Sequence, residues 1–254
     1  MTVRTCTKVN IGLHVLRRRP DGYHDLETLF VPYYGLGDEL TIEPAARTSI
    51  EIVHGSEAPW DPQQDLTIRA WRLLKADFPN LPDVSIRLVK GAPVGAGLGG
   101  GSADAALALK LIRDLGGLDL SDADLAAYAA RLGSDCAFFV HCRPMFGTGR
   151  GEILEPADID LSGYDLRVEV PEGVAVSTRE AYAGITPNAD RPSLKELLRA
   201  PAEEWKDLII NDFEKSVFAA HPEIPALKQS LYERGAIYAA MSGSGSAVFG
   251  LFRK

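Results

Sequence analysis

The chain has 254 residues, of which 46% are hydrophobic and 24% are charged, and its formal net charge is −8 at pH 7. These proportions are ordinary for a soluble globular protein, and the length allows one large domain or two small ones. The acidic balance argues against a nucleic-acid-binding protein, because such proteins usually carry a basic patch.

No stretch of the sequence approaches the roughly 20 apolar residues of a membrane span. The first residues, Met-Thr-Val-Arg-Thr-Cys, lack the apolar run of a signal peptide. We therefore expect a cytoplasmic protein without a membrane partner. The cysteines, Cys6, Cys136 and Cys142, are odd in number and match no zinc spacing, so reduced packing residues are predicted. The histidines are scattered, and no metal site is predicted.

The first predicted element, residues 3–16, is β-rich and forms one long strand or a strand pair. Lys8 and Asn10 stand inside it. A lysine within an apolar strand costs free energy unless it finds a partner. The alternative is a surface-facing lysine on an edge strand, and the spacing alone does not decide between the two.

A turn is predicted next at Pro20-Asp21-Gly22, because proline fixes φ and glycine accepts positive φ. Arg17–Arg19 precede the turn and form a local cationic patch. Tyr23 and His24 follow it, and their rings are suited to stacking on a ring ligand and to hydrogen bonding with it. The alternative is an ordinary hairpin with a solvated basic edge.

Strands are predicted at 26–31, 39–44 and 84–89, and 38–43 is expected to pair with 48–53. Residues 59–65 read as a loop and 66–78 have helical spacing. Ser121 and Asp124 suggest a capping box for a helix over 122–132. Further helices are predicted over 177–184, 193–199, 211–220 and 222–235, and further strands over 165–170, 237–241 and 248–252.

Residues 93–106 are the most distinctive stretch, with five glycines before an Ala/Leu-rich segment, 103–115, that predicts a helix. A glycine loop that enters a helix N-terminus binds anions, above all phosphate. Ser102 is expected at the N-cap and Asp104 in the first turn. The alternative is a flexible surface loop, against which Leu98 in the middle argues.

Two known phosphate loops do not fit this stretch. The Walker pattern fails because no lysine follows the glycines. The dinucleotide fingerprint can be placed on Gly95, Gly97 and Gly100, but it needs an acidic residue at a strand end about 20 residues further on. Residues 116–119 at that distance predict a turn, so we reject the dinucleotide interpretation.

Two features stand further along the chain. Asp135 opens an apolar segment, 136–140, and the plain alternative to a functional role is a helix N-cap, where aspartate is common. A second glycine loop, 242–246, lies between the last two predicted strands.

The pattern P-x-G-x-G-L-G-G-G-S-A-D-A-A resembles the second motif of the GHMP kinase superfamily, which includes galactokinase, homoserine kinase and mevalonate kinase. Further segments resemble the branch that phosphorylates the 2-hydroxyl of a cytidine-diphosphate-linked methylerythritol on the non-mevalonate route to isoprenoid precursors. They run in family order: 8–11, 18–30, 132–135, 149–152, 211–214 and 241–246. The R-P-D-G-Y-H segment discriminates this branch from the others.

The resemblance implies an α+β fold of two domains, residues 1–162 like ribosomal protein S5 domain 2 and residues 163–254 ferredoxin-like. It implies that Asp135 is the catalytic base and that Lys8 lies beside it. It also implies that the reacting alcohol lies near Asn10. The cytosine is expected against Tyr23, His24 and Tyr182, where the family usually has phenylalanine at 182. Thr178, Gly243 and Ser244 complete the expected substrate site.

The resemblance further implies ATP and Mg²⁺. The loop expected to hold the ATP phosphates comprises Pro93, Val94, Gly95, Ala96, Gly97, Leu98, Gly99, Gly100, Gly101, Ser102 and Ala103. Ser102 would touch Mg²⁺ or a phosphate. Lys90, Asp65 and Leu66 are expected to line the adenine site. The family commonly has asparagine where Asp65 stands, which removes an amide donor.

Two other functions remain open at this point. One is a GHMP kinase with a different alcohol substrate, and the other is a non-catalytic nucleotide-binding sensor on the same fold. The presence of both Asp135 and Lys8 disfavours the sensor. The expected partners are small molecules, not nucleic acid, and the chain is expected to be a monomer or homodimer.

Overall fold

The computed structural model describes residues 2–55 and 60–254, and the chain divides into two compact units. The first comprises the described residues of Met1–Thr7, Tyr34–Val94 and Gly99–Arg143, and the second comprises Lys8–Tyr33, Gly95–Leu98 and Pro144–Lys254. The chain therefore passes between the units several times. One passage lies within residues 93–103, the first glycine loop. The domain limit predicted at residue 163 lies inside the second unit, between two of its strands.

The first unit contains a four-stranded sheet in the order β1 (Thr2–Arg4), β4 (Glu39–Pro44), β6 (Val84–Val89) and β5 (Ser49–Val53). β4 is antiparallel to β6, whereas β5 runs parallel to β6 on its other side. The predicted pairing of 38–43 with 48–53 is therefore wrong. β6 takes the place between them because its alternating Val84, Ile86 and Leu88 are fully buried.

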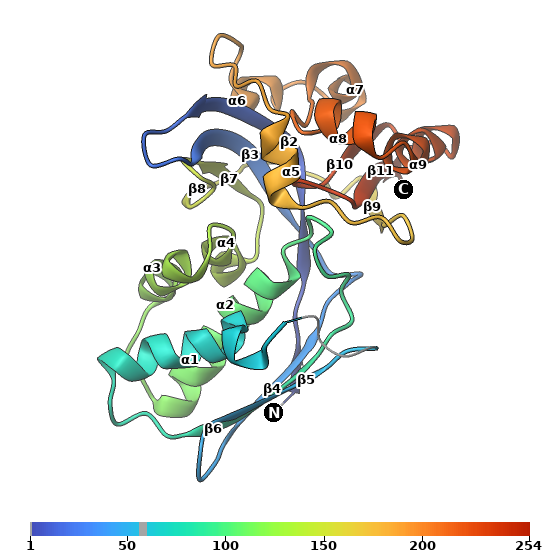
Figure 1. The fold of residues 1–254 in the computed structure, drawn as a ribbon. Helices are drawn as coiled ribbons and strands as arrows, with labels where there is room; N and C mark the ends of the chain where they lie inside the picture. Colours follow the sequence, from blue (N-terminus) through green and yellow to red (C-terminus); the bar gives the residue numbers. More distant parts are fainter. Residues whose placement is uncertain (1, 56–59) are drawn as a thin grey trace. The chain divides into compact units, whose positions relative to one another are not determined.

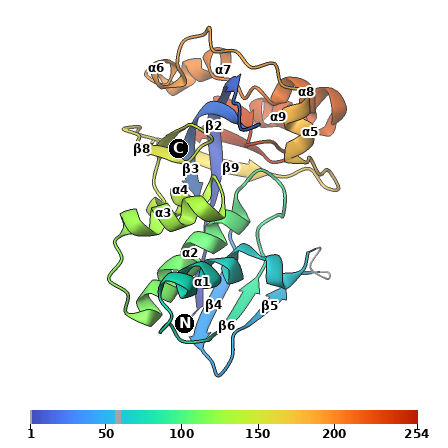
Figure 2. The same ribbon diagram turned by 60° about the vertical axis from the view of Figure 1, so that its left-hand side comes forward.

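The first unit also contains helices. They are α1 (Leu66–Asp77), α2 (Gly100–Gly116), α3 (Asp122–Leu132) and α4 (Cys136–His141), with a short 3-10 turn at Pro62–Gln64. α1 and α2 pack on each other, and α2 contacts β4 (Figures 1 and 2). The predicted capping box is confirmed, since the Ser121 hydroxyl accepts from Asp124 N and the Asp124 carboxylate accepts from Ser121 N. Pro59 of the predicted loop lies outside the described residues.

The start of α2 differs from the prediction. Gly99 is the N-cap, with φ of +71°, and Ser102 is the third residue of the helix. Asp104 lies beyond the first turn, buried at 1% exposure. The glycines permit this earlier start, because a left-handed N-cap residue is easily adopted only without a Cβ.

The second unit contains two sheets. One has the order β2 (Thr7–Arg18), β3 (His24–Tyr33), β7 (Met145–Thr148) and β8 (Ile153–Pro156). The other has the order β10 (Tyr238–Met241), β11 (Val248–Arg253) and β9 (Tyr164–Glu169). The sequence did not predict β7, whose Gly147 packs against the Phe30 ring of β3 and leaves no alternating apolar signal.

The helices of this unit are α5 (Thr178–Ala183), α6 (Leu194–Leu197), α7 (Trp205–Leu208), α8 (Glu214–Ala220) and α9 (Glu223–Glu233), with a 3-10 turn at Ala202–Glu204. α8 begins three residues later than predicted, because Asn211 forms a bridge with Leu13 of β2. A core that includes Leu13, Phe213 and Val248 joins β2, α8, α9 and the last strands. Within the described part of the chain, no helix is long and apolar enough to cross a bilayer.

Candidate active site

Lys8 lies on β2 and is buried, with 3% of its surface exposed. Its ammonium donates to Asn10 Oδ1 at 2.5 Å and to the Gly97 carbonyl at 2.9 Å. The interpretation as a surface lysine is therefore excluded. A buried ammonium needs such acceptors, because its desolvation is otherwise costly.

A chain of hydrogen bonds fixes Asn10, the side-chain acceptor of this lysine. Asn10 Nδ2 donates to Thr28 Oγ1 at 2.9 Å, and the Thr28 hydroxyl donates to the Gly12 carbonyl at 2.7 Å. Both ends of the Asn10 amide are thus used, one toward Lys8 and one toward β3. This arrangement sets the amide orientation and directs its oxygen at the ammonium.

The second unit holds the first half of the first glycine loop against the second loop. A Cβ added at Gly97 would lie 2.2 Å from the Ser242 carbonyl, and Gly97 has φ of +76°. The Ser242 hydroxyl donates to the Gly97 carbonyl at 3.0 Å, and Ala247 N donates to the Ala96 carbonyl at 3.0 Å. Lys8 N donates to the Leu98 carbonyl at 2.9 Å. Three segments distant in sequence therefore meet at Gly97.

Asn211 holds the second glycine loop in place. Its Nδ2 donates to the carbonyls of Met241 and Gly243, both at 2.8 Å, and it is 2% exposed. Gly243 has φ of +54°, and a Cβ there would lie 3.3 Å from Lys8 Nζ. Ser244 follows and is half-buried. Sequence reasoning did not assign Asn211 to the site, although its segment was among those that resemble the family.

Of the predicted aromatic residues, His24 is the first residue of β3, Tyr23 directly precedes it, and Tyr182 lies on α5. The rings of His24 and Tyr182 stack with centroids 4.8 Å apart and planes at 23°, and Tyr182 packs its ring edge-to-face with Phe213. Tyr23 is 55% exposed, and the Arg150 guanidinium lies 4.8 Å from its ring centroid. Burial, with the charge of Arg18, lowers the pKa of His24, which favours the neutral ring.

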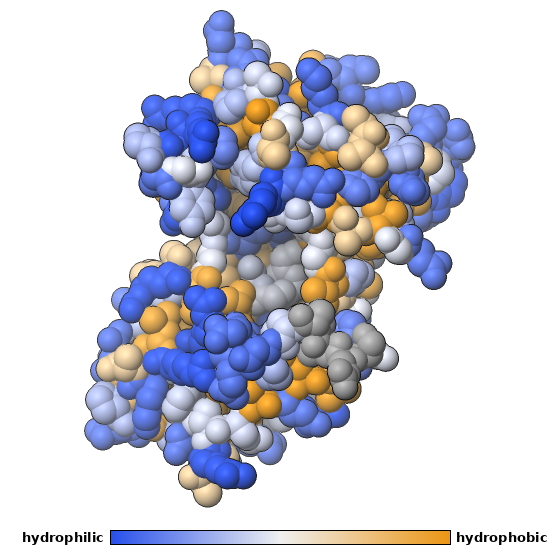
Figure 3. Space-filling model, in the orientation of Figure 1, coloured by the Kyte–Doolittle hydropathy of each residue, from blue (hydrophilic) through white to orange (hydrophobic). Residues whose placement is uncertain are grey.

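Thr178 is exposed in the first turn of α5, which the Ser177 hydroxyl caps by accepting from Glu180 N. The arginines before Tyr23 engage carboxylates of their own hairpin. Arg17 and Arg19 pair with Asp25, and Arg19 also pairs with Asp21 at 3.0 Å. The surface over this hairpin, labelled β2 and β3 in Figure 1, is strongly hydrophilic (Figure 3).

Asp135 occupies the N-cap position of α4 in the first unit. Its side chain is half-buried and makes no capping hydrogen bond to the helix. The next residue, Cys136, is fully buried, which raises its thiol pKa to about 11 despite a hydrogen bond with the Ser102 hydroxyl. Lys8 belongs to the second unit, so its partnership with Asp135 stays a prediction.

Lys90 follows β6, and its side chain is 5% exposed. Its ammonium forms an ion pair with Asp38 and donates a hydrogen bond to Asp104 Oδ2 at 2.8 Å. Burial raises the pKa of Asp104 to about 8, against the opposing charge of Lys90. The predicted contact of Lys90 with adenine stays a prediction.

Asp65 caps α1, which begins at Leu66. Its Oδ1 accepts from Thr67 N at 2.8 Å and from the Thr67 hydroxyl at 2.7 Å, and its Oδ2 accepts from Trp60 Nε1 at 3.1 Å. The aspartate thus has a local structural use, since a charged acceptor at a helix N-terminus is stabilising. The contact of Asp65 with adenine stays a prediction.

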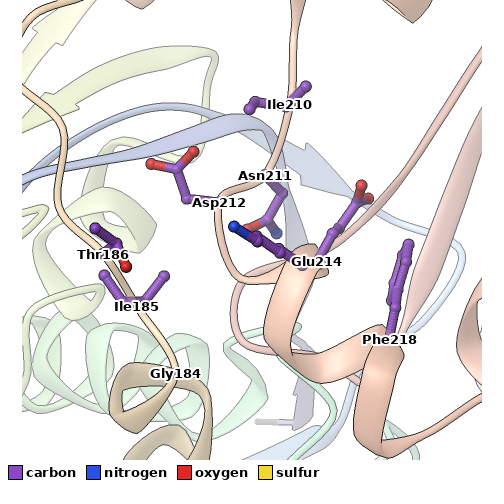
Figure 4. Close-up of a pocket in the computed structure, with 9 residues that line it drawn as sticks. Gly184, Ile185, Thr186, Ile210, Asn211, Asp212, Glu214 and Phe218 are labelled. Carbon is purple, nitrogen blue, oxygen red and sulfur yellow. The ribbon is translucent and has the colours of Figure 1, made fainter.

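A cavity of about 410 Å³ lies in the second unit and contains none of the predicted site residues. Ile185, Ile210 and Phe218 give it apolar walls (Figure 4). Two polar side chains of its lining are already engaged, Asn211 by loop carbonyls and Asp212 by Arg191 at 2.7 Å. The cavity therefore borders the residues that support the second glycine loop.

Comparisons with known proteins identify the family of the chain. The family model described as "GHMP kinases N terminal domain" matches residues 65–143, and "GHMP kinases C terminal" matches residues 185–254. A Parabacteroides distasonis protein named 4-diphosphocytidyl-2-C-methyl-D-erythritol kinase is 49% identical over 247 residues, covering 97% of this chain and 90% of its own. A Bacteroides fragilis protein of the same name is 50% identical, with 96% and 89% coverage.

Solved structures show the same relationship. A crystal structure of 4-(cytidine 5'-diphospho)-2C-methyl-D-erythritol kinase superposes with a TM-score of 0.82 at 34% identity, covering 99% of this chain and 90% of that one. A homoserine kinase from Cytophaga hutchinsonii shares the fold, with a TM-score of 0.69 at 15% identity over 100% of this chain and 85% of that one. This chain therefore belongs to the 4-diphosphocytidyl-2-C-methyl-D-erythritol kinase family of the GHMP kinases.

Proposed function

We propose that this protein transfers the γ-phosphoryl group of ATP to the 2-hydroxyl of 4-diphosphocytidyl-2-C-methyl-D-erythritol, a step of isoprenoid precursor synthesis. One observation carries the proposal beyond family membership. The Lys8 ammonium is held by Asn10 and by the Gly97 carbonyl, so a cation is fixed where β2 meets both glycine loops. A kinase of this family uses ATP as co-substrate, and the cytoplasm is the expected compartment.

In this proposal Asp135 accepts the proton of the attacking hydroxyl. Lys8 contributes a positive charge that favours the developing alkoxide and the ionised form of a neighbouring carboxylate. Transfer is in line, and the protein contributes chiefly positioning and electrostatic stabilisation. The Lys8 ammonium is held in place because Asn10, its acceptor, is itself hydrogen-bonded to Thr28.

The phosphates of ATP would lie against the backbone N–H groups of residues 95–102, at the N-terminus of α2. Among residues 2–55 and 60–254, no group of three or more His, Cys, Asp or Glu side chains could hold a metal by itself. The proposed Mg²⁺ ion would arrive with ATP, because Mg²⁺ is commonly bound by substrate phosphates, water and few protein ligands. Ser102 would be its protein contact, and the ion would shield the phosphate charge.

The cytosine would bind at the aromatic residues of β3 and α5. The stacked His24 and Tyr182 and the exposed Tyr23 offer ring faces, and neutral His24 can donate or accept at the base edge. Gly243 and Ser244 would approach the diphosphate of the substrate. Thr178 lies one turn before Tyr182 on α5.

The test of this function measures ADP release from ATP and Mg²⁺ with three acceptors in parallel. We expect release with 4-diphosphocytidyl-2-C-methyl-D-erythritol and not with mevalonate or homoserine. Release with one of the other alcohols alone would contradict the substrate. ATP binding without release for any acceptor would favour the non-catalytic sensor.

The assigned base has its own test. Asp135→Asn preserves the side-chain shape and removes the proton acceptor, so we expect kcat to fall by at least about 100-fold, the usual contribution of such a group, with ATP binding unchanged. Glu51→Gln, which alters an exposed carboxylate of β5 paired with Arg87, serves as control. A variant at residue 135 that retains a few per cent or more of the activity would show that another group accepts the proton.

A further inference from the structure

The described part of the first unit contains a buried ion cluster with no part in the mechanism above. It consists of Asp38, Lys90 and Asp104, whose side chains are 0%, 5% and 1% exposed. Asp38 precedes β4, Lys90 follows β6, and Asp104 lies on α2. Charged side chains are seldom buried this completely without a specific arrangement of partners.

The cluster connects the residues just before the first glycine loop to the helix that follows it. Asp38 Oδ1 accepts from Gly91 N at 2.7 Å and from Ala92 N at 2.8 Å, the two residues just before the loop. Asp38 Oδ2 accepts from the Lys90 ammonium. The same ammonium donates to Asp104 Oδ2 at 2.8 Å, and Asp104 lies five residues beyond the N-cap of α2. One cluster therefore holds the chain on both sides of the loop.

The cluster also lies directly beneath the junction of loop and helix. A Cβ added at Gly100, the first residue of α2, would be 3.5 Å from Asp38 Oδ2 and 4.0 Å from Lys90 Nζ. Gly91 approaches so closely that a Cβ there would lie 2.7 Å from the Gly37 carbonyl. Asp38 itself is fixed, because its backbone N donates to the Thr5 hydroxyl at 2.8 Å.

We propose that Asp38 is a positioning residue for the nucleotide: with Lys90 and Asp104 it clamps both ends of the first glycine loop and so sets the geometry of its phosphate-binding N–H groups. This inference rests on the proposed function only in assuming that the loop binds ATP phosphates. Asp38 acts through the loop and does not touch the nucleotide. Two backbone donors and one ammonium converge on its carboxylate.

The experiment measures ADP affinity by calorimetry, without acceptor, for wild type and for Asp38→Ala, Asp38→Asn and Asp104→Asn. We expect Asp38→Ala to weaken ADP binding by at least about tenfold, because it removes all three acceptor contacts. Asp38→Asn keeps an oxygen for the loop amides and alters only the Lys90 contact, so a smaller loss is expected. Asp104→Asn should have the smallest effect.

Two readouts separate positioning from simple destabilisation. Leu74→Ala removes a fully buried side chain of α1 in the same unit and should lower the melting temperature without weakening ADP binding. Hydrogen exchange of residues 90–99 should quicken in Asp38→Ala, which removes the acceptor of Gly91 N and Ala92 N, and not in Leu74→Ala. Glu51→Gln, on the exposed pair with Arg87, controls for loss of a carboxylate from the same sheet.

The outcomes are distinct. If folded Asp38→Ala and Asp38→Asn bind ADP within twofold of wild type, or if Leu74→Ala weakens binding as much, the positioning role is overturned. If ADP binding falls as expected while wild type phosphorylates no alcohol, the clamp stands and the proposed reaction fails. If wild type binds no ADP at millimolar concentration, both fail.

Discussion

The Lys8 ammonium and the Gly97 carbonyl are joined by a hydrogen bond of 2.9 Å, although 89 residues separate them in the chain. The same carbonyl accepts from the Ser242 hydroxyl at 3.0 Å. One backbone oxygen thus connects the buried cation of β2 to both glycine loops. Glycine at 97 is what permits this approach, because a Cβ there would collide with the Ser242 carbonyl.

Gly97→Ala is therefore expected to reduce kcat/KM by about 10- to 100-fold, since displacement of a positioning group by even 1 Å can have that effect. Gly95→Ala is the matched control. Gly95 has nearly the same φ, +73° against +76°, but a Cβ there meets nothing within 4 Å. Both variants carry the same backbone strain, and steady-state kinetics isolate the collision. Equal losses in the two variants would contradict the importance of the contact.

Asn10→Ala removes an acceptor from the buried Lys8 ammonium and leaves the Thr28 hydroxyl without its donor. We expect the free energy of unfolding to fall by about 1–3 kcal/mol. We also expect kcat to fall by a larger factor than the factor by which KM changes. Urea unfolding and steady-state kinetics measure the two effects. Thr28→Val, which removes only the next link, should cost less activity. Unchanged kcat in Asn10→Ala would show that the orientation of Lys8 does not matter.

Local signals in the sequence predicted local structure well. The strand at Val84–Val89 and the helix at Asp122–Leu132 have the bounds that alternation and the capping box indicate. Strand order was not predictable in this way. β5 pairs with β6 and not with β4, because burial in the assembled sheet decides which strand lies in the middle.

For the site, too, local motifs were predictive and contacts between distant segments were not. A sequence motif indicated Lys8. Spacing could not predict that it is buried, because one of its acceptors is a carbonyl of a loop distant in the chain. Asn211 was missed because its role exists only through carbonyls 30 and 32 residues away. Asp38 carried no motif at all, and only the folded sheet places it beside Lys90.

His14 is expected to make stability depend on pH. Its ring is 1% exposed, and neither ring nitrogen has a hydrogen-bond partner among the described residues. Burial, aided by the charge of Arg191 and opposed by Asp212, lowers the pKa of His14 to about 4. The folded state thus resists a proton that the unfolded state takes up below about pH 6.5. Stability is full above that pH and falls by up to about 3 kcal/mol as the pH approaches 4.

Urea unfolding at several pH values between 4 and 7 measures this effect. His14→Phe keeps the site apolar and cannot titrate, so the difference in unfolding free energy between it and wild type should grow with acidification. The test compares how this difference changes with pH, so any pH-independent packing cost of the larger ring cancels. Parallel pH profiles for the two proteins would show that His14 does not contribute.

Cys142 is expected to be the reactive thiol of this protein. Its Sγ lies 2.8 Å from Cys6 Sγ, and the Tyr34 hydroxyl donates to its carbonyl at 3.3 Å. The hydrogen bond from Cys6 outweighs burial and lowers the pKa of Cys142 to about 6, whereas that of Cys6 is raised. Since the thiolate is the nucleophile, a half-exposed Cys142 should react at neutral pH while buried Cys6 and Cys136 do not.

Brief alkylation with iodoacetamide at pH 7, followed by peptide mass spectrometry, tests this assignment. We expect the label on Cys142 first, and Cys142→Ser should lose the fast phase. Cys6→Ser keeps a hydroxyl donor beside the thiolate, so its fast phase should persist. Labelling of Cys136 at the same rate as Cys142 would contradict the assignment, because Cys136 is fully buried and burial raises its pKa.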